Sequence, residues 1–434
     1  MARLFRRCRS RVLLWALATL GLWGCVPGAH RPAALAQATA VRAAWVQLGP
    51  GGVATARAVA DRSRCPEMVV EGRPREMRVR AAPVPLRFPG ATCEADLPPG
   101  ASSASVNGIP LPLPRTNPTR IEVIGDTGCR VKGKRAQACN DPKEWPLAWI
   151  ARSAAAFRPD LVIHVGDYLY REGPCPEGNA GCAGSPHGDH WLAWEADFFG
   201  PLGPLLRAAP WIMVRGNHEL CSRKGGTGWF RFLDPYPATN ACPDMTPPYV
   251  ISLGALRLVV LDSAVASDHP TPQEIAAYRR HLATVEDLAR GGAWLLTHRP
   301  LWAATNLSKK PKEEKLYPSN ATLQAALAGR APAGVSLILS GHVHLFEALG
   351  FHGGLPPQLV VGNSGTQLNA PILSDLAGRT LGGALVASAV VQRSFGFATL
   401  EPGVQGWTLF LRDVDGRPTR RFEIQGNRLR LVAE

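Results

Sequence analysis

The stretch Leu161-Val162-Ile163-His164-Val165-Gly166-Asp167-Tyr168-Leu169-Tyr170 decides the fold. Its first half is an apolar, largely β-branched run, with the length of a strand that is buried on both faces. Gly166 then allows the backbone to turn, Asp167 follows directly, and Tyr170 comes three residues later. The stretch therefore predicts a buried strand that carries a carboxylate and a phenol at its carboxyl end.

Four other apolar runs end in the same way, at side chains of the types that bind metals. Ligands of α/β sheets bind in the crevice at the carboxyl ends of the strands, so we expect these side chains to converge in a two-metal centre. The runs and the residues that follow them are Ile121–Gly125 with Asp126, Trp211–Val214 with Asn217, His218 and Glu219, Trp294–Thr297 with His298, and Ser336–Ser340 with His342 and His344.

Length and composition indicate an ordinary globular protein. The chain of 434 residues is long enough for one large domain and a small one, and its hydrophobic content is 46%. The formal charge is +14, but residues 1–36 contain six Arg and no acid, which leaves 42 basic and 34 acidic groups beyond them. No basic block is interleaved with aromatic residues, so we expect no nucleic-acid partner.

Residues 1–36 have the pattern of an export signal. Several Arg residues precede the apolar stretch 12–23, which is too short for a comfortable membrane span. Ala34-Leu35-Ala36 fits a cleavage site, so we expect an exported protein, periplasmic or secreted, whose mature chain has no transmembrane span. The alternative is lipoprotein cleavage at Leu22-Trp23-Gly24-Cys25, which would leave the protein in the cell envelope with a lipid anchor on Cys25.

Eight cysteines lie beyond this leader, and their spacing divides them into four local couples. An even count in an exported chain favours disulfides over thiolate metal ligands. We therefore predict the pairs Cys65–Cys93, Cys129–Cys139, Cys175–Cys182 and Cys221–Cys242.

The pattern of predicted secondary structure in the mature chain changes near residue 118. Residues 37–118 hold short alternating runs separated by Pro and Gly, which predict a small, sandwich-like, all-β domain. Strands alternate with helices over 119–434, the expected second domain. The clearest helices are Trp145–Phe157 and Pro272–Arg290, and the second begins with a capping box from Thr271 to Glu274.

Turns and inserts complete the second domain. Pro247–Leu261 predicts a hairpin around Gly254, and Phe395–Val432 is again strand-like. Gly173–His190 and Leu307–Ala333 are expected to be long, turn-rich inserts.

In their order and residue types, the five motifs resemble those of the calcineurin-like metallophosphoesterase superfamily, and specifically its purple acid phosphatase-like branch. The resemblance covers about 120–369. Most of the superfamily has Asp-x-His in the first motif, whereas Gly128 stands at the His position here. The purple branch also lacks this His and supplies a Tyr three residues after the bridging Asp, as Tyr170 follows Asp167. The resemblance implies an α/β (α+β) fold with a β-sandwich flanked by helices (αββα).

The resemblance also implies how the ligands divide between two metal ions. Two carboxylates and a phenolate suit Fe(III) at site one, and an amide oxygen with two imidazoles suits Fe(II), Zn or Mn at site two. His218 would bind no metal; as the catalytic residue it would stabilise charge on the phosphate or protonate the leaving group. Site one would comprise Asp126, Asp167, Tyr170 and His344, and site two Asp167, Asn217, His298 and His342.

The expected activity is hydrolysis of phosphate monoesters by in-line attack of a metal-bound hydroxide, on a small phosphate-ester substrate. A phosphodiesterase or nucleotidase with the same two metals is the alternative. A non-enzymatic envelope binding protein on the same scaffold is a third possibility. His164 lies on the buried strand itself, so we expect it to be a core histidine.

Overall fold

The computed structural model describes residues 39–223, 225–238, 241–310 and 312–432. The predicted signal over 1–36 and the alternative lipid anchor at Cys25 lie outside these residues. Ala38–Glu434 forms one compact unit. None of the described helices is long and apolar enough to cross a membrane.

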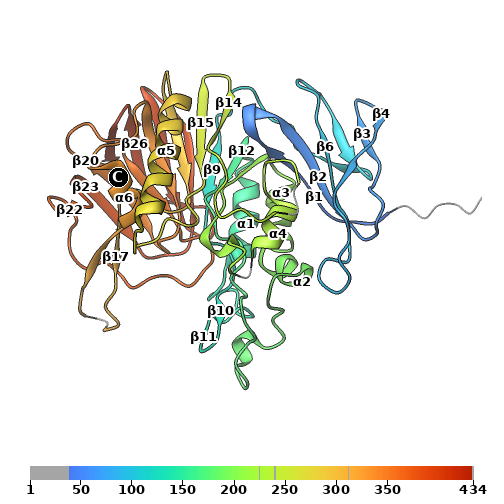
Figure 1. The fold of residues 1–434 in the computed structure, drawn as a ribbon, viewed down its shortest axis with the longest axis horizontal. Helices are drawn as coiled ribbons and strands as arrows, with labels where there is room; N and C mark the ends of the chain where they lie inside the picture. The colour runs from blue at the N-terminus through green and yellow to red at the C-terminus, as the bar shows by residue number, and fades with distance from the viewer. Residues whose placement is uncertain (1–38, 224, 239–240, 311, 433–434) are drawn as a thin grey trace, which may run out of the picture. The chain divides into compact units, whose positions relative to one another are not determined.

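Two large mixed sheets form the body of this unit (Figure 1). The first has the spatial order β27 (Arg428–Val432), β26 (Pro418–Gln425), β25 (Gly406–Arg412), β24 (Phe397–Gly403), β9 (Ile121–Ile124), β12 (Leu161–His164), β13 (Trp211–Met213), β1 (Val41–Leu48), β2 (Ala54–Ala60), β6 (Thr92–Asp96) and β5 (Arg78–Ala81). The second has the order β14 (Tyr249–Leu253), β15 (Leu256–Leu261), β16 (Ala293–Thr297), β19 (Val335–Ser340), β21 (Gln358–Val361), β20 (Phe346–Phe351), β23 (Ala384–Gln392) and β22 (Thr380–Leu381).

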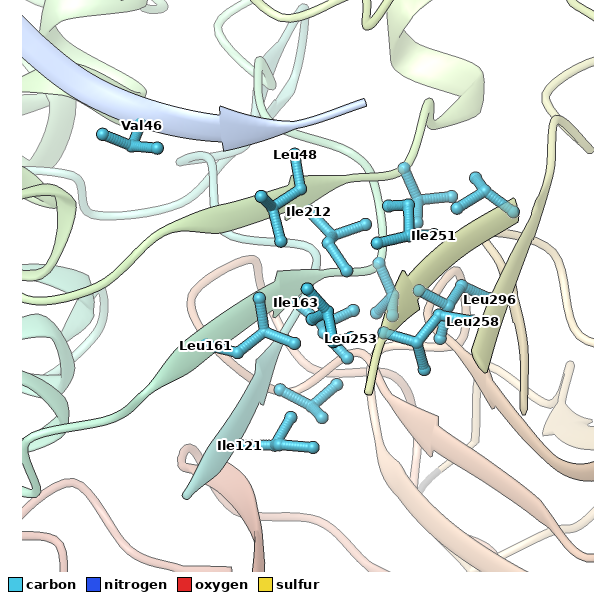
Figure 2. Packing of buried hydrophobic residues seen from close by; sticks show 14 of the residues in the cluster. Val46, Leu48, Ile121, Leu161, Ile163, Ile212, Ile251, Leu253, Leu258 and Leu296 are labelled. Atoms are coloured by element: carbon cyan, nitrogen blue, oxygen red, sulfur yellow. The ribbon is translucent and has the colours of Figure 1, made fainter. Parts of the chain in front are cut away.

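The core lies between the two sheets because alternate residues of their strands point into it. Leu161 and Ile163 of β12 pack there against residues such as Leu258 and Leu296 of the second sheet (Figure 2). Each fully buried aliphatic side chain of this kind contributes about 1.5–3 kcal/mol. Val162, the residue between Leu161 and Ile163, faces the opposite side of the sheet. The strand is therefore buried on both faces, as its sequence predicts.

Helices cover the outer face of each sheet, which gives the predicted αββα order of layers. The cluster outside the first sheet involves α1 (Leu147–Ala156), α2 (Trp191–Trp194), α3 (Gly203–Leu206) and α4 (Gly226–Phe232). The cluster outside the second involves α5 (Pro272–Leu288) and α6 (Ala321–Leu327). Helix α5 begins as predicted, with Thr271 and Glu274 each accepting from the other's backbone N–H.

The insert expected over Leu307–Ala333 is more ordered than its composition indicates, and this part of the prediction was wrong. It contains β18 (Leu316–Ser319), which pairs with β17 (Ala303–Asn306), and then α6. The Asn320 side chain caps α6 by accepting from the N–H of Leu323. Leu323 and Leu327 are buried against the second sheet, and this packing stabilises a helix too short to be evident from its sequence.

Residues 39–118 consist mainly of strands, as expected, but four of these strands belong to the first large sheet. Strands β1, β2, β6 and β5 extend the first large sheet, since Gln47 of β1 pairs in parallel with Trp211 of β13. A small sheet of β4 (Arg73–Arg75), β3 (Met68–Val70), β7 (Ala104–Val106) and β8 (Ile109–Pro110) packs against them. Buried Arg57 donates to the carbonyls of Phe232 and Asp234, which ties these strands to the segment after α4.

All four predicted cysteine couples are bonded as disulfides. Cys129–Cys139 closes the segment that holds the small hairpin of β10 (Val131–Lys132) and β11 (Arg135–Ala136). Disulfides persist in oxidising compartments, so the pattern agrees with an extracytoplasmic protein.

Candidate metal centre

Five strands of the two sheets bring the predicted donors to one place. Strands β9, β12 and β13 run parallel in the first sheet, as do β16 and β19 in the second. The carboxyl ends of the two sets meet: the backbone N–H of His342 donates to Asp126 over 2.8 Å, and Nδ1 of His298 lies 2.9 Å from the carbonyl of Val165. The structure therefore places all seven predicted donors and His218 around one centre.

The hydroxyl of Tyr170 is the meeting point of the first group of donors. Its oxygen lies 2.9 Å from Oδ1 of Asp126, 2.7 Å from Oδ2 of Asp167 and 2.9 Å from Nε2 of His344. Nδ1 of His344 lies 2.9 Å from the carbonyl of Gln367, which can only accept, so in the neutral ring this nitrogen carries the proton and Nε2 is an acceptor. One hydroxyl proton thus faces three acceptors.

A cation at this position would supply the positive charge that the three acceptor atoms around the Tyr170 hydroxyl lack. Burial, followed by the charges of Asp126 and Asp167, raises the pKa of Tyr170 well above its usual range. A multivalent cation among the same atoms would reverse this effect and favour the phenolate. The donor set therefore fits a hard metal ion better than a network of hydrogen bonds.

A second group of donors shares Asp167 with the first. The ligand atoms of Asp167, His298 and His342 all lie within 4.8 Å of one another. The amide oxygen of Asn217 is 3.2 Å from Nε2 of His298. Burial lowers the pKa of His298, but the charge and hydrogen bond of Asp167, together with the charge of Asp126, raise it to about 9. Metals bind the neutral ring, so binding at His298 releases a proton.

Two buried carboxylates that the sequence analysis did not assign hold the donor-bearing loops. Glu219 accepts from the N–H groups of Tyr168 and Gly216, which links the loop of Asp167 to that of Asn217. Burial raises the pKa of Glu219 to about 8. Its position directly after the Asn-His pair is the only signal that could have identified it.

Asp197 is the second such carboxylate, and it fixes the loop of Tyr170. It accepts from the backbone N–H groups of Cys129 and Tyr170 and from the side chain of Arg171. It lies after α2, in a turn of π-helix far from every motif, and no local pattern in the sequence indicates it.

Gly128 packs against the backbone of the segment that carries Tyr170, and a side chain does not fit at this position. A Cβ atom there would lie 2.6 Å from the carbonyl oxygen of Tyr168 and 2.8 Å from both the amide of Tyr170 and a carboxylate oxygen of Asp197. The loops of Asp126 and Asp167 already hold left-handed backbone angles, with φ of 53° and 60°. With the backbone of Tyr168–Tyr170 and the Asp197 side chain in these positions, a His does not fit at 128.

His218 lies at the edge of the donors and has its own partners. Its Nδ1 is 2.8 Å from Oε1 of Glu172, and its Nε2 is 3.0 Å from a guanidinium nitrogen of Arg223. Burial lowers the pKa of His218. Burial raises the pKa of Glu172, but His218, Lys132 and Arg223 together hold that pKa well below its usual range. Glu172 and Arg223 were not predicted as site residues, and no sequence motif marks them.

His164 is a core histidine, as expected. It is fully buried and stacks on the ring of Tyr168 with centroids 3.9 Å apart. Its two ring nitrogens lie within hydrogen-bond distance of the Thr127 hydroxyl and the Gly166 N–H.

The donors open into a cavity of about 390 Å³. Its lining includes Asp167, Tyr170, Asn217, His218, His342 and His344. Residues of the β10–β11 hairpin form one wall, and residues of β17 and β18 form another. Pockets that hold a whole small molecule have volumes of about 300–1,000 Å³, so there is room for more than one phosphate group.

A family model described as calcineurin-like phosphoesterase matches residues 119–346, just over half of the chain. The chain belongs to the calcineurin-like phosphoesterase family. Membership makes it a metal-dependent phosphoric ester hydrolase, and the family implies a binuclear metal site. Among curated proteins, none matches this chain significantly.

Two solved structures share the fold of this phosphoesterase. One is purple acid phosphatase PPD1 from seeds of yellow lupin (Lupinus luteus), with a TM-score of 0.58 and 16% identity over 88% of this chain and 74% of that one. The other is the structure of PhoD, with a TM-score of 0.55 and 11% identity over 91% of this chain and 92% of that one. At these identities the likeness concerns the fold alone.

Substitution of Gly128 by Ala should destabilise the protein by about 1–3 kcal/mol, because the surrounding backbone has to move. The displaced atoms include the amide of Tyr170, so the metal content per chain should fall as well. Urea unfolding and metal analysis measure the two effects. Gly203→Ala is the matched control, since its added Cβ would meet only the flexible end of Arg207, at 3.4 Å. Equal stability and equal metal content in the two variants would contradict the steric account.

Proposed function

We propose that this phosphoesterase is an exported phosphatase that hydrolyses phosphate monoesters at a binuclear metal site of the purple acid phosphatase type. The observation that carries the proposal is the hydroxyl of Tyr170, which faces three acceptor atoms with one proton to donate. A phenolate ligand at this position, beside a Gly128 that admits no side chain, supports the purple branch over the wider family.

The donors divide between the two ions by their chemistry. Asp126, Tyr170 and His344 with the shared Asp167 form a hard, anionic set that favours Fe(III). Asn217, His298 and His342 with Asp167 form a softer set that favours Fe(II), Zn or Mn. When bound, the two ions would activate a water molecule and stabilise the attacking and leaving oxygens of the phosphate ester.

His218 is proposed to act on the substrate and not on a metal. It lines the cavity next to Tyr170, with ring centroids 3.8 Å apart. Glu172 fixes the ring through Nδ1, so Nε2 is directed to the side of Arg223. Because Nδ1 donates to Glu172, Nε2 carries a proton only in the protonated ring, and in that form the ring would donate a hydrogen bond to the phosphate or a proton to the leaving group.

Export completes the proposal. The Arg-rich, apolar pattern over 1–36 and the four disulfides support a periplasmic or secreted protein. Retention in the envelope through a lipid on Cys25 is the alternative location. Detection of a mature N-terminus near Gln37 by mass spectrometry supports the first, and a lipidated Cys25 supports the second.

Activity against two matched substrates tests the proposal. The iron- and zinc-loaded protein should hydrolyse an aryl phosphate with a higher kcat/KM than the corresponding bis-aryl phosphate diester. The cavity has room for a second ester group, so a preference for the diester would instead establish the phosphodiesterase alternative. Turnover of neither substrate by the metal-loaded protein would favour a binding protein on this scaffold.

His218→Ala should retain both metals and lose about 10²–10⁴-fold in kcat, the usual size of a general acid–base contribution. Metal analysis beside kinetics with the aryl phosphate measures both. Asp167→Asn is the contrasting variant: it removes the one carboxylate that the two sites share, so metal content should fall along with activity. A His218 variant that loses metal would show that this residue is a ligand.

A further inference from the structure

The cavity has a cationic wall that the proposed chemistry does not use. Arg130, Lys132 and Arg135 lie on or beside the β10–β11 hairpin and line the cavity, and Arg223 lines it as well. We refer to residues 130–136 as the cationic hairpin. Cationic groups along a pocket concentrate anions and direct them to the reacting centre.

Only some of these charges are balanced by carboxylates. Glu172 accepts from Nζ of Lys132 over 2.7 Å and from Nη2 of Arg223 over 2.6 Å, so these two cations share one acid. Neither Arg130 nor Arg135 forms an ion pair within the part of the chain that the structure describes. The hairpin therefore presents two guanidinium groups without an acidic partner to the cavity.

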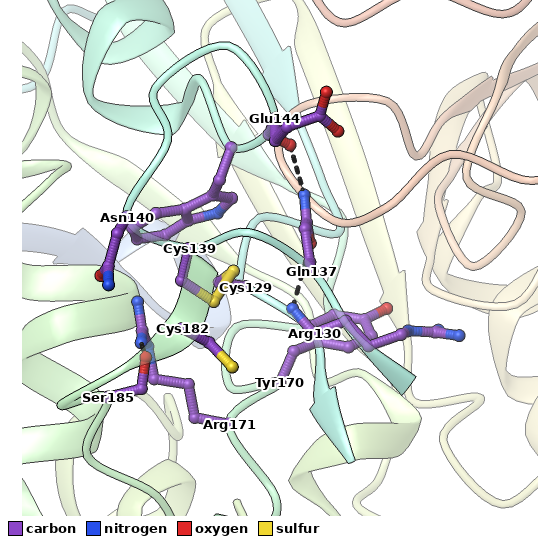
Figure 3. Close-up of a disulfide and its surroundings, with 12 residues drawn as sticks. Cys129, Arg130, Gln137, Cys139, Asn140, Glu144, Tyr170, Arg171, Cys182 and Ser185 are labelled. Atoms are coloured by element: carbon purple, nitrogen blue, oxygen red, sulfur yellow. Dashed lines mark hydrogen bonds between the residues drawn. A yellow bond between two sulfur atoms is a disulfide. The ribbon is translucent and has the colours of Figure 1, made fainter. Parts of the chain in front are cut away.

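Arg130 links this wall to the donor cluster. Its guanidinium carbon lies 5.5 Å from the centroid of the Tyr170 ring, and the two side chains lie beside each other in Figure 3. Tyr170 is the residue whose hydroxyl touches Asp126, Asp167 and His344. A group bound by Arg130 is therefore a neighbour of any phosphate bound at the donors.

The base of the hairpin is held by a disulfide and by a buried side chain, which fix the backbone that carries the two arginines. The Cys129–Cys139 disulfide closes it. Buried Gln137 accepts from the N–H of Arg130 over 3.1 Å and donates to the carbonyls of Glu144 and Gly365, as Figure 3 shows in part. Such preorganisation lowers the entropy cost of binding.

We propose that Arg130 and Arg135 form a second anion subsite, which selects phosphate esters whose alcohol part carries another phosphate group. The inference rests on the proposed phosphatase function and deepens it. The guanidinium fork matches phosphate oxygens in pairs, and a phosphate dianion balances two such groups. A second phosphate is therefore preferred to a carboxylate, which carries a single charge.

Three substrates that share the same three-carbon chain test this subsite: 3-hydroxypropyl phosphate, propane-1,3-diol bisphosphate and 3-phosphonooxypropanoate. The wild-type protein should have the highest kcat/KM for the bisphosphate, corrected for its two equivalent esters. In Arg135→Ala the ratio of kcat/KM between the bisphosphate and the monophosphate should fall roughly tenfold, mainly through KM. The Arg135 side chain is exposed and forms no hydrogen bond or ion pair with other described residues, so the fold should persist.

Arg428→Ala is the matched control, because it removes the same charge from an exposed position on β27, outside the cavity. An unchanged ratio in the Arg135 variant, or an equal fall in the Arg428 variant, would overturn the subsite. Preference for the carboxylate substrate would overturn the assignment to phosphate. If the wild type hydrolyses none of the three esters nor an aryl phosphate, the proposed function fails, and that outcome is distinct from a lost preference.

Discussion

Two carboxylates with almost no exposure to solvent, Asp126 and Asp167, lie against one hydroxyl, and the rest of the structure is arranged to hold them there. Buried anions are costly unless opposite charge compensates them. The imidazoles of His298 and His344 lie 3.2 and 3.3 Å from these carboxylates, yet His344 directs its acceptor nitrogen at the cluster. Cations are therefore the natural complement of the site, and the packing of the two sheets provides the rigid frame.

The donor side chains are held in place by both the sheets and the loops that follow the strands. The core between the sheets fixes the ends of β9, β12, β16 and β19, and side chains such as Glu219 and Asp197 fix the loops that follow the strands. Three donors have positive φ angles, namely Asp126, Asp167 and His342. Strained backbone of this kind persists only where the surroundings over-determine it, and it clusters at functional sites.

Most of the candidate site could be predicted because its signals are local. Each donor follows an apolar run, and the pair of Gly128 and Tyr170 is visible within a short stretch of sequence. The capping box at Thr271 and the cysteine couples are local as well. Contacts between distant segments could not be predicted, and these include the pairing of Gln47 with Trp211 that joins residues 39–118 to the large sheet. Helix α6 was missed for the same reason, since its stability comes from packing on the second sheet.

The central claim is a bond between Tyr170 and a ferric ion. It would explain why the Tyr170 hydroxyl faces three acceptor atoms, why residue 128 is a glycine and not a His ligand, and why the motifs resemble those of the purple acid phosphatases. The visible absorption spectrum of the iron-loaded protein beside that of its Tyr170→Phe variant tests this bond most directly. Phe removes only the oxygen, so the fold should remain intact. The account predicts a purple or pink charge-transfer band in the wild type that is absent from the variant. A colourless iron-loaded wild type, or the same band in both proteins, would contradict it.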